Sequence, residues 1–215
     1  MPSQTGSSAN STTPRRRHSE RELTFAEQAR REQLINVTIE LIAQNGAART
    51  SLQSIAEAAS ITKAAVLYHY PSKQAVIQAA YEVVRTGLIE HMRQKITAAD
   101  GPSAAVEAYL TSQLAYLTEH PHHVRVMAES FNDPTSGISE HTDTETRWRP
   151  LAELIARAQQ AGEYEASANA STHAIIYGGA VDALTAETLS NPDFSLKSGA
   201  IGIIEILHAF TKSSN

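Results

Sequence analysis

Two short helical segments separated by a tight turn constrain this chain more than any other feature of its sequence. The first segment covers residues 52–59 and the second covers residues 62–69, with a turn at residues 60 and 61 between them. Two short helices joined in this way have the layout of a helix-turn-helix unit. A small shared core would fix the crossing of the two helices, and the residues expected to form it are Ile55, Ala59, Ile61 and Val66.

A longer helix is predicted before this pair. Thr24 and Glu27 have the spacing of a capping box, in which each side chain satisfies a free backbone N–H group at the start of a helix. Apolar residues recur at helical spacing from Leu34 onward, and Gly46 supplies the left-handed residue that ends the helix.

Further caps and breaks divide the rest of the chain. Thr50, with Gln53 three residues later, is the predicted cap of the first short helix, and Ser72 is the predicted cap of a long helix over residues 73–97. Pro, Gly and Asn then separate the remaining helical patterns, at about residues 103–119, 121–131, 139–161, 169–190 and 197–212. The sequence therefore predicts an all-α fold of about nine helices and no strands.

The same signals predict three parts of the chain. Residues 1–23 are rich in Ser, Thr and Arg without a periodic apolar position, which is typical of a flexible tail. Residues 24–78 form the expected N-terminal three-helix domain with the helix-turn-helix unit, and residues 79–215 form a C-terminal helical domain.

Composition excludes several classes of protein. Without Cys the chain has no disulfide framework, thiolate nucleophile or Cys-based zinc site. No apolar run approaches the roughly 20 residues of a membrane-spanning helix, and the polar N-terminus is not a secretory signal, so we expect a cytoplasmic protein with no membrane partner. His120, His122 and His123 lie together, but a Pro among them and the lack of a carboxylate constellation argue against a metal site. We predict no catalytic residue, metal or other cofactor.

Charge is distributed unevenly along the chain. Residues 15–78 hold nine Lys and Arg against six Asp and Glu, a balance of +3, whereas residues 79–215 hold nine against 17, a balance of −8. Together these return the net charge of −5. A basic N-terminal third on an acidic body favours a protein that approaches a polyanion through that third alone.

The stretch over residues 31–84 resembles the DNA-binding domain of TetR-family transcriptional regulators. The matching features are the apolar helix that ends in Asn45 and Gly46, Thr50 followed by Ile55 and Ala56, and the run YHYPSK over residues 68–73 before a long helix. The chain departs from the family pattern at Ser60 and Ala64, where Gly is frequent, and at Leu67, where many members have a DNA-contacting Tyr.

This resemblance implies a set of DNA-binding residues. Phosphate contacts fall to Thr50 or Ser51, to His69 and to Lys73, and Tyr68 flanks the last two. Gln53 occupies a base-reading position, because an amide can pair bidentately with adenine, and Thr62 and Lys63 face bases or backbone. Arg15, Arg16 and Arg17 form either an arm that reaches the minor groove or a solvated tail, and the sequence leaves both open.

The resemblance also implies a ligand-binding and dimerisation role for residues 79–215. An effector pocket would lie among the middle helices, and the last two helices would pair two subunits. Polar, aromatic and Met residues on otherwise apolar helix faces are the candidate ligand contacts: Leu88, His91, Met92, Tyr109, Gln113, Met127, Phe131, Trp148 and Tyr177.

The predicted function is that of a homodimeric repressor which binds a palindromic DNA operator and is released by a small-molecule effector. One alternative is an all-helical enzyme or metal-binding protein with an incidental N-terminal unit. Another is a DNA-binding structural protein without an effector, which predicts a solid C-terminal domain.

Overall fold

The computed structural model describes residues 24–132 and 144–211, which form nine α-helices and no strand. The helices are α1 (Phe25–Asn45), α2 (Leu52–Ala58), α3 (Lys63–His69), α4 (Lys73–Thr97), α5 (Pro102–Glu119), α6 (Pro121–Asn132), α7 (Thr144–Gln160), α8 (Ala170–Ser190) and α9 (Leu196–Thr211). The all-α prediction is confirmed, and the predicted helix bounds agree within one residue. Two bounds cannot be compared, because the predicted start of the seventh helix, residue 139, and the predicted end of the ninth, residue 212, lie outside the described residues.

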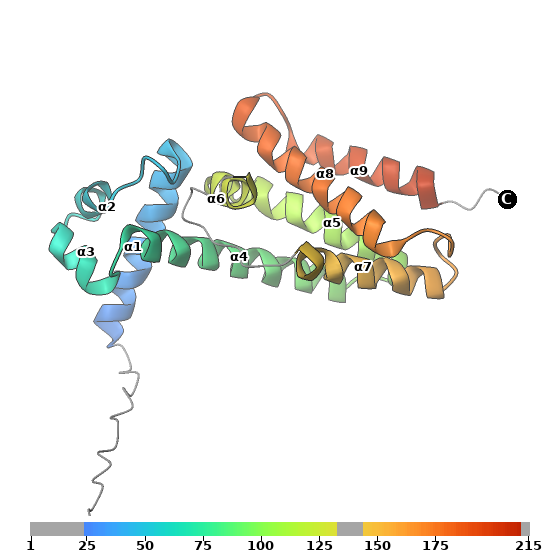
Figure 1. The fold of residues 1–215 in the computed structure, drawn as a ribbon, viewed down its shortest axis with the longest axis horizontal. Coiled ribbons are helices and arrows are strands. Elements are labelled where there is room, and N and C mark those ends of the chain that lie inside the picture. Colours follow the sequence, from blue (N-terminus) through green and yellow to red (C-terminus); the bar gives the residue numbers. More distant parts are fainter. Residues whose placement is uncertain (1–23, 133–143, 212–215) are drawn as a thin grey trace, which may run out of the picture.

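The helices are arranged along an elongated molecule (Figure 1). α1, α2 and α3 gather at one end, and α4 runs from them along the length of the molecule. α5 packs against both α4 and α9, and α7 packs against α5 and α8. In the described parts of the chain, no helix combines the length and apolarity needed to cross a membrane.

Two hydrophobic cores divide the molecule. The smaller core joins α1, α2, α3 and the start of α4, and the larger one joins α4 to α9 and also takes in Ile39 and Ile42 of α1. α4 belongs to both, because Val76 packs in the small core while the next buried residue, Ile77, packs in the large one. A movement of α4 would therefore change the packing of both cores.

The end of α1 is held by a polar contact with α6. The Glu129 carboxylate accepts a hydrogen bond from the buried N–H of Ala47 at 2.8 Å, and the Arg125 guanidinium donates to the carbonyl oxygens of Ala43 and Gln44, each at 3.2 Å. Gly46 has the predicted positive φ, +82°, and a Cβ there would lie 2.8 Å from a Glu129 carboxylate oxygen. Only Gly fits this junction without strain.

α8 and α9 bury one face and expose another apolar face. Tyr177 and Val181 of α8 and Leu207 of α9 lie in the large core. On their other faces, Ile176 is 56% exposed and Ile201 is 57% exposed, and Ile175, Leu189 and Ile206 are exposed as well. The two helices thus close the large core and also present apolar surface to the outside.

Candidate nucleic-acid interface

The helix-turn-helix unit is built around the small core. Of its predicted members, Ile55, Ala59 and Val66 are buried, and Ile61 is half-buried against them. Leu34 from α1 and Val76 from α4 complete the core, so α2 and α3 are packed on two longer helices. This packing matters because helices of seven residues are not stable alone in water.

The turn between α2 and α3 depends on Ser60. Its φ is +55°, the left-handed region, which makes it the one non-glycine residue of positive φ among the described residues. The turn is closed by the N–H of Ser60 donating to the carbonyl of Glu57 at 3.0 Å, and by the N–H of Ile61 donating to Ala56 at 2.9 Å. Ser60 therefore adopts the conformation that a Gly would adopt more readily at this position.

The N-terminus of α2 is capped by Ser51, and the prediction that Thr50 caps it is wrong. Ser51 Oγ accepts from the N–H of Ser54 at 3.0 Å, and Ser54 Oγ accepts from the N–H of Ser51 at 2.9 Å. Thr50 is only 1% exposed, and its hydroxyl donates to the carbonyl of Gly46 at 2.9 Å. Thr50 lies one residue before the cap position, and its hydrogen bond links the loop to the end of α1. Because its side chain is buried there, we leave Thr50 out of the proposed DNA contacts.

The outward face of α3 carries the residues that the resemblance assigned to DNA. Lys63, Ala64 and Tyr68 are exposed on α3, whose Val66 is buried in the small core, and Ala64 and Tyr68 lie on the side away from Val66. Thr62 is exposed too, but its hydroxyl caps the helix by accepting from the N–H of Ala65 at 3.1 Å. The helix thus presents a cation, a small side chain and an aromatic ring on one outer surface.

Tyr68 and His69 connect α3 to α1. The Tyr68 hydroxyl donates to the Glu27 carboxylate at 3.0 Å while its ring stays exposed, and the His69 ring meets it edge-on at 5.0 Å. Arg31 donates to the backbone carbonyl of His69 at 2.6 Å and lies 4.3 Å above the ring of Tyr70. These contacts fix the direction of α3 relative to the first turns of α1.

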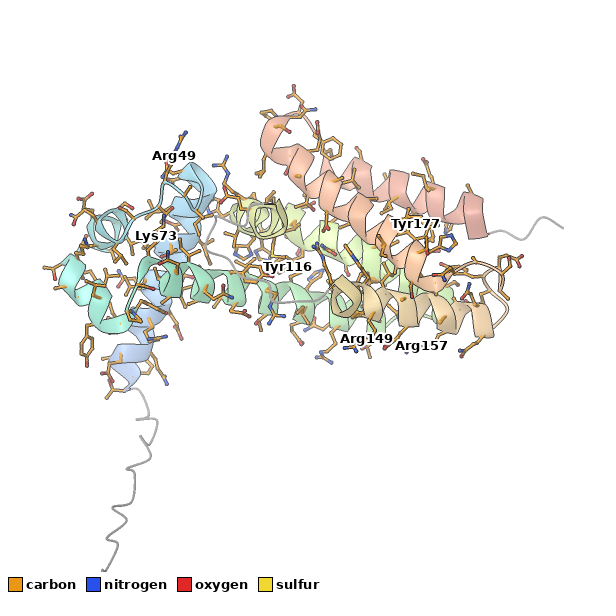
Figure 2. All side chains as sticks on the ribbon, in the orientation of Figure 1. Arg49, Lys73, Tyr116, Arg149, Arg157 and Tyr177 are labelled. Carbon is orange, nitrogen blue, oxygen red and sulfur yellow. The ribbon has the colours of Figure 1, made fainter. Side chains whose placement is uncertain are left out.

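Lys73 begins α4 beside the loop that precedes α2. Its ammonium donates to the carbonyl of Ala48 at 2.9 Å, and Ser72 caps the helix as predicted, accepting from the N–H of Ala75 at 3.1 Å. Figure 2 shows Arg49 in the same loop, at the same end of the molecule as Lys73. Arg49 is exposed and was missed by sequence reasoning, because only the Lys73–Ala48 contact reveals that this loop borders the start of α4.

The remaining predicted DNA contacts are Gln53 and the three arginines of the N-terminal segment. Gln53 is exposed on α2 and its amide donates to Glu57 one turn later at 2.8 Å, so it must exchange that partner to read a base. Arg15, Arg16 and Arg17 lie outside the described residues.

Four of the predicted ligand contacts meet in the large core, which buries Leu88, Met92, Met127 and Tyr177. Tyr109 and Trp148 are half-buried against this core, and Gln113 is half-buried on α5. The ring of His91 lies 5.6 Å from that of Tyr116, and its Nε2 is buried with no hydrogen-bond partner in the described parts of the chain. The side chain of Phe131 lies outside the described residues.

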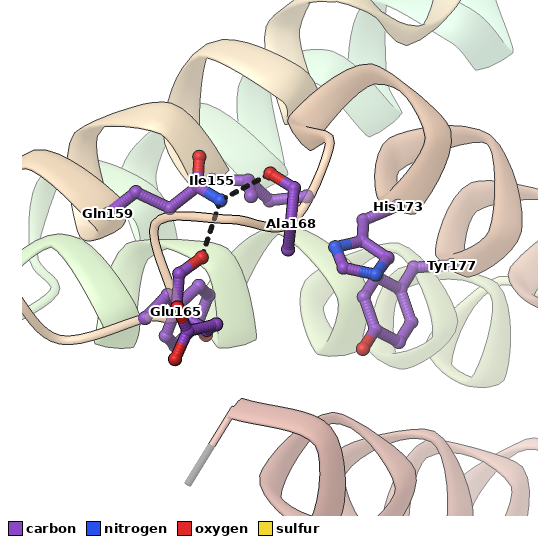
Figure 3. A pocket seen from close by; sticks show the side chains of 7 residues that line it. Ile155, Gln159, Glu165, Ala168, His173 and Tyr177 are labelled. Carbon is purple, nitrogen blue, oxygen red and sulfur yellow. Dashed lines mark hydrogen bonds between the residues drawn. The ribbon is translucent and has the colours of Figure 1, made fainter. Parts of the chain in front are cut away.

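A small cavity lies between the end of α7 and α8 (Figure 3). Its volume is about 20 Å³, room for one water molecule. Of the predicted ligand contacts only Tyr177 lines it, together with Ile155, Gln159, Tyr164, Glu165, Ala168 and His173. Gln159 closes one wall by donating to the carbonyl oxygens of Glu165 and Ala168 at 2.8 and 2.7 Å.

These features define a helix-turn-helix DNA-binding protein with an additional helical domain. Residues 34–80 match the family model described as bacterial regulatory proteins, tetR family. Residues 34–80, which hold the helix-turn-helix unit, are therefore similar to the N-terminal region of TetR-family transcriptional regulators, as the sequence predicted. Comparison with curated proteins gives no match.

Solved structures share the fold over most of the chain. The fatty acid degradation regulator FadR from Bacillus halodurans is 14% identical, with a TM-score of 0.72 over 83% of this chain and 94% of that one. FadR from Bacillus subtilis in complex with stearoyl-CoA is 16% identical, with a TM-score of 0.69 over 82% and 96%. SmeT, the repressor of the Stenotrophomonas maltophilia multidrug efflux pump SmeDEF, is 21% identical, with a TM-score of 0.71 over 87% and 93%, and has also been solved with triclosan.

Proposed function

We propose that the protein is a cytoplasmic homodimeric repressor that binds a palindromic operator and releases it when a small molecule occupies the C-terminal domain. The observation that carries the proposal is the outer surface formed by α3, the α1–α2 loop and the start of α4. Lys63, Lys73 and Arg49 contribute cations to this surface, and α3 projects outward from it. Cations hold DNA phosphates, and a short projecting helix fits the major groove.

We propose two domains, with residues 24–78 as the DNA-binding domain, which holds the small core, and residues 79–215 as the ligand-binding and dimerisation domain, which supplies most of the large core. Ile39, Ile42, Ala47 and Ile77 of the first domain also pack in the large core and join the two domains. Arg15, Arg16 and Arg17 precede the start of α1, which is bound to α3 through Glu27 and Tyr68. We propose that these arginines act as a minor-groove arm, since the first turn of α1 lies beside α3.

The proposed dimer interface is the exposed apolar face of α8 and α9. Ile176 and Ile201 are more than half exposed, and a Cβ built on Gly179 or Gly202 meets open space. Exposed apolar residues beside small residues let helices of a second subunit approach closely. A two-fold axis through this face would present two copies of α3 to two half-sites of a palindrome.

The proposed effector site is the part of the large core around His91. Leu88, Met92 and Met127 make it apolar, and the unpartnered Nε2 of His91 offers a hydrogen bond to a ligand. This chemistry suits a largely apolar molecule with a polar group. The ligands named for two structural relatives, stearoyl-CoA and triclosan, share that character. Because the core is well filled, the ligand must displace side chains to enter.

Two connections would carry ligand binding to the DNA surface. α4 belongs to both cores, and α6 holds the end of α1 through Arg125 and Glu129. Two half-sites require a recognition-helix spacing of about 34–36 Å or a multiple of it. A ligand that prefers a different spacing lowers DNA affinity by its differential binding free energy, about 1–3 kcal/mol in typical cases.

The test is selection of bound duplexes from a random DNA library, followed by affinity measurements at several salt concentrations. We expect a palindromic sequence and a steep loss of affinity with salt. Lys73→Ala should weaken binding to all sequences alike and reduce the salt slope by about one. Lys95→Ala, at the opposite end of the same helix, is the matched control and should bind as the wild type does.

A second measurement tests the effector. Triclosan and stearoyl-CoA serve as probes, and either should raise the Tm and release the selected duplex, with His91→Phe weakening both effects. If DNA binding is confirmed but no ligand in a broad apolar library changes it, the DNA-binding protein without an effector becomes the better description. If no sequence is selected, the repressor proposal fails.

A further inference from the structure

The recognition helix α3 exposes an aliphatic side chain on its outer surface. Leu67 is 41% exposed, and Ala64, one turn earlier, is exposed beside it. At about 100° per residue, Leu67 points a quarter turn away from the buried Val66, so it cannot join the small core without rotating the helix. Leu67 and Ala64 together form an exposed apolar strip, which is a consequence of how the buried Val66 orients α3.

The apolar strip is surrounded by cationic and aromatic side chains that can contact DNA. Lys63 precedes it on the same helix, and Tyr68 follows it. Arg49 and Lys73 lie on the neighbouring loop and helix start. An apolar protein partner would leave these cations buried and unpaired, whereas a DNA duplex pairs them with phosphates. The charges around the strip thus favour DNA as its occupant.

The major groove offers a matching apolar feature. Its base edges consist of hydrogen-bond donors and acceptors except for the C5-methyl group of thymine. A Leu side chain offers no hydrogen bond, so it discriminates between bases through contact with that methyl group. The small Ala64 lets the helix backbone come close enough for Leu67 to reach it.

We propose that Leu67, supported by Ala64, reads the C5-methyl group of a thymine in each operator half-site. This inference rests on the proposed function, because it requires α3 to enter the major groove. It assigns a specificity-determining role to a residue that carries no charge and no hydrogen-bonding group.

The experiment replaces each thymine of the selected operator, one at a time in both half-sites, by deoxyuridine. This change removes the methyl group and keeps the base pair. For the wild-type protein, one position should lose about fourfold in affinity per half-site, the effect of removing one buried methyl contact. For Leu67→Ala, the loss at that position should fall below about twofold. Far-UV circular dichroism establishes that the variant is folded.

Ile89→Ala is the matched control, since Ile89 is an exposed aliphatic residue on α4, outside the proposed DNA surface. It should leave the deoxyuridine effect at the wild-type value. The inference is overturned if no thymine is sensitive, or if the sensitive position responds equally in the wild type and in Leu67→Ala. Failure to select any operator would instead refute the proposed function and this inference with it.

Discussion

The indole ring of Trp148 lies directly against the backbone of Gly178, so that a Cβ on Gly178 would come within 2.1 Å of ring atom Cζ3. The contact joins α7 to α8 inside the C-terminal domain. Gly178→Ala should therefore lower the free energy of unfolding by about 1–3 kcal/mol, because the indole must leave its place in a packed core. Urea denaturation followed by tryptophan fluorescence measures both the stability and the displacement of this single Trp.

The adjacent glycine provides the control. A Cβ on Gly179 meets no atom within 4 Å in the subunit, so Gly179→Ala should raise subunit stability by up to about 1 kcal/mol through helix propensity. If the proposed dimer interface is correct, the same change should raise the dissociation constant of the dimer, as sedimentation equilibrium can show. Equal effects of the two substitutions on unfolding would contradict the packing described here.

Ser60 holds the turn of the helix-turn-helix unit at φ +55°. The left-handed conformation costs a non-glycine residue about 1–2 kcal/mol. Replacement by Gly removes this cost, but part of the gain is lost because Gly raises the conformational entropy of the unfolded chain. Ser60→Gly should therefore stabilise the protein by about 0.5 kcal/mol. Ser60→Val should destabilise it, because a β-branched residue tolerates this region worst. Urea midpoints that rank Val equal to Gly would show that the turn relaxes to another conformation.

The helix-turn-helix unit could be predicted from the sequence because local chemistry specifies it. Caps at Thr24 and Ser72 and the break at Gly46 each act within one turn of the chain, and the structure has all three. Thr50 shows the limit of this reasoning. Both Thr50 and Ser51 are suitable caps by residue type. The choice of Ser51 follows only from the structure, in which the Thr50 hydroxyl donates to the carbonyl of Gly46 and Ser51 Oγ accepts from the helix N-terminus.

The contacts between distant segments could not be predicted in the same way. Arg49 is an isolated cation in the sequence, and it joins the candidate interface only because Lys73 binds the carbonyl of Ala48. The candidate ligand residues were chosen by type and spacing, which select core positions and ligand positions alike. Most of them do lie in or against the large core, but how a ligand would open that core depends on packing energies between helices.

The contact between α6 and the end of α1 gives a further prediction. Glu129→Ala removes the acceptor of the buried Ala47 N–H, and an unpaired buried donor costs about 1–3 kcal/mol. Glu129→Gln keeps an acceptor oxygen and should recover most of that loss in urea denaturation. Glu119→Ala, at an exposed position near the end of α5, serves as the control and should change stability by less than about 0.5 kcal/mol. A Gln variant as unstable as the Ala variant would mean that the charge of Glu129, rather than its hydrogen bond, holds the junction.

His123 gives the chain a predictable dependence on pH. Burial, the largest cause, together with the nearby His120 and His122 lowers the pKa of His123 to about 4. The 3.1 Å contact with Tyr116 suits the neutral ring, whose Nδ1 can accept the proton of the Tyr116 hydroxyl. In the unfolded chain the imidazole takes up a proton near its ordinary pKa of about 6.5. Between about pH 6.5 and pH 4 the unfolded state therefore binds more protons, and the free energy of unfolding falls as the pH falls through this window.

His123→Gln retains a hydrogen-bonding side chain that does not titrate, so it should lose less stability than the wild type between pH 7.5 and pH 5. The exposed neighbour His122 supplies the matched control, and His122→Gln should keep the wild-type pH dependence. Urea midpoints of the three proteins at the two pH values make the comparison. A wild-type midpoint that does not move between them would show that His123 is free to take up its proton in the folded protein, and that its packing against Tyr116 and His120 is looser than the ring contacts of 5.6 and 5.0 Å describe.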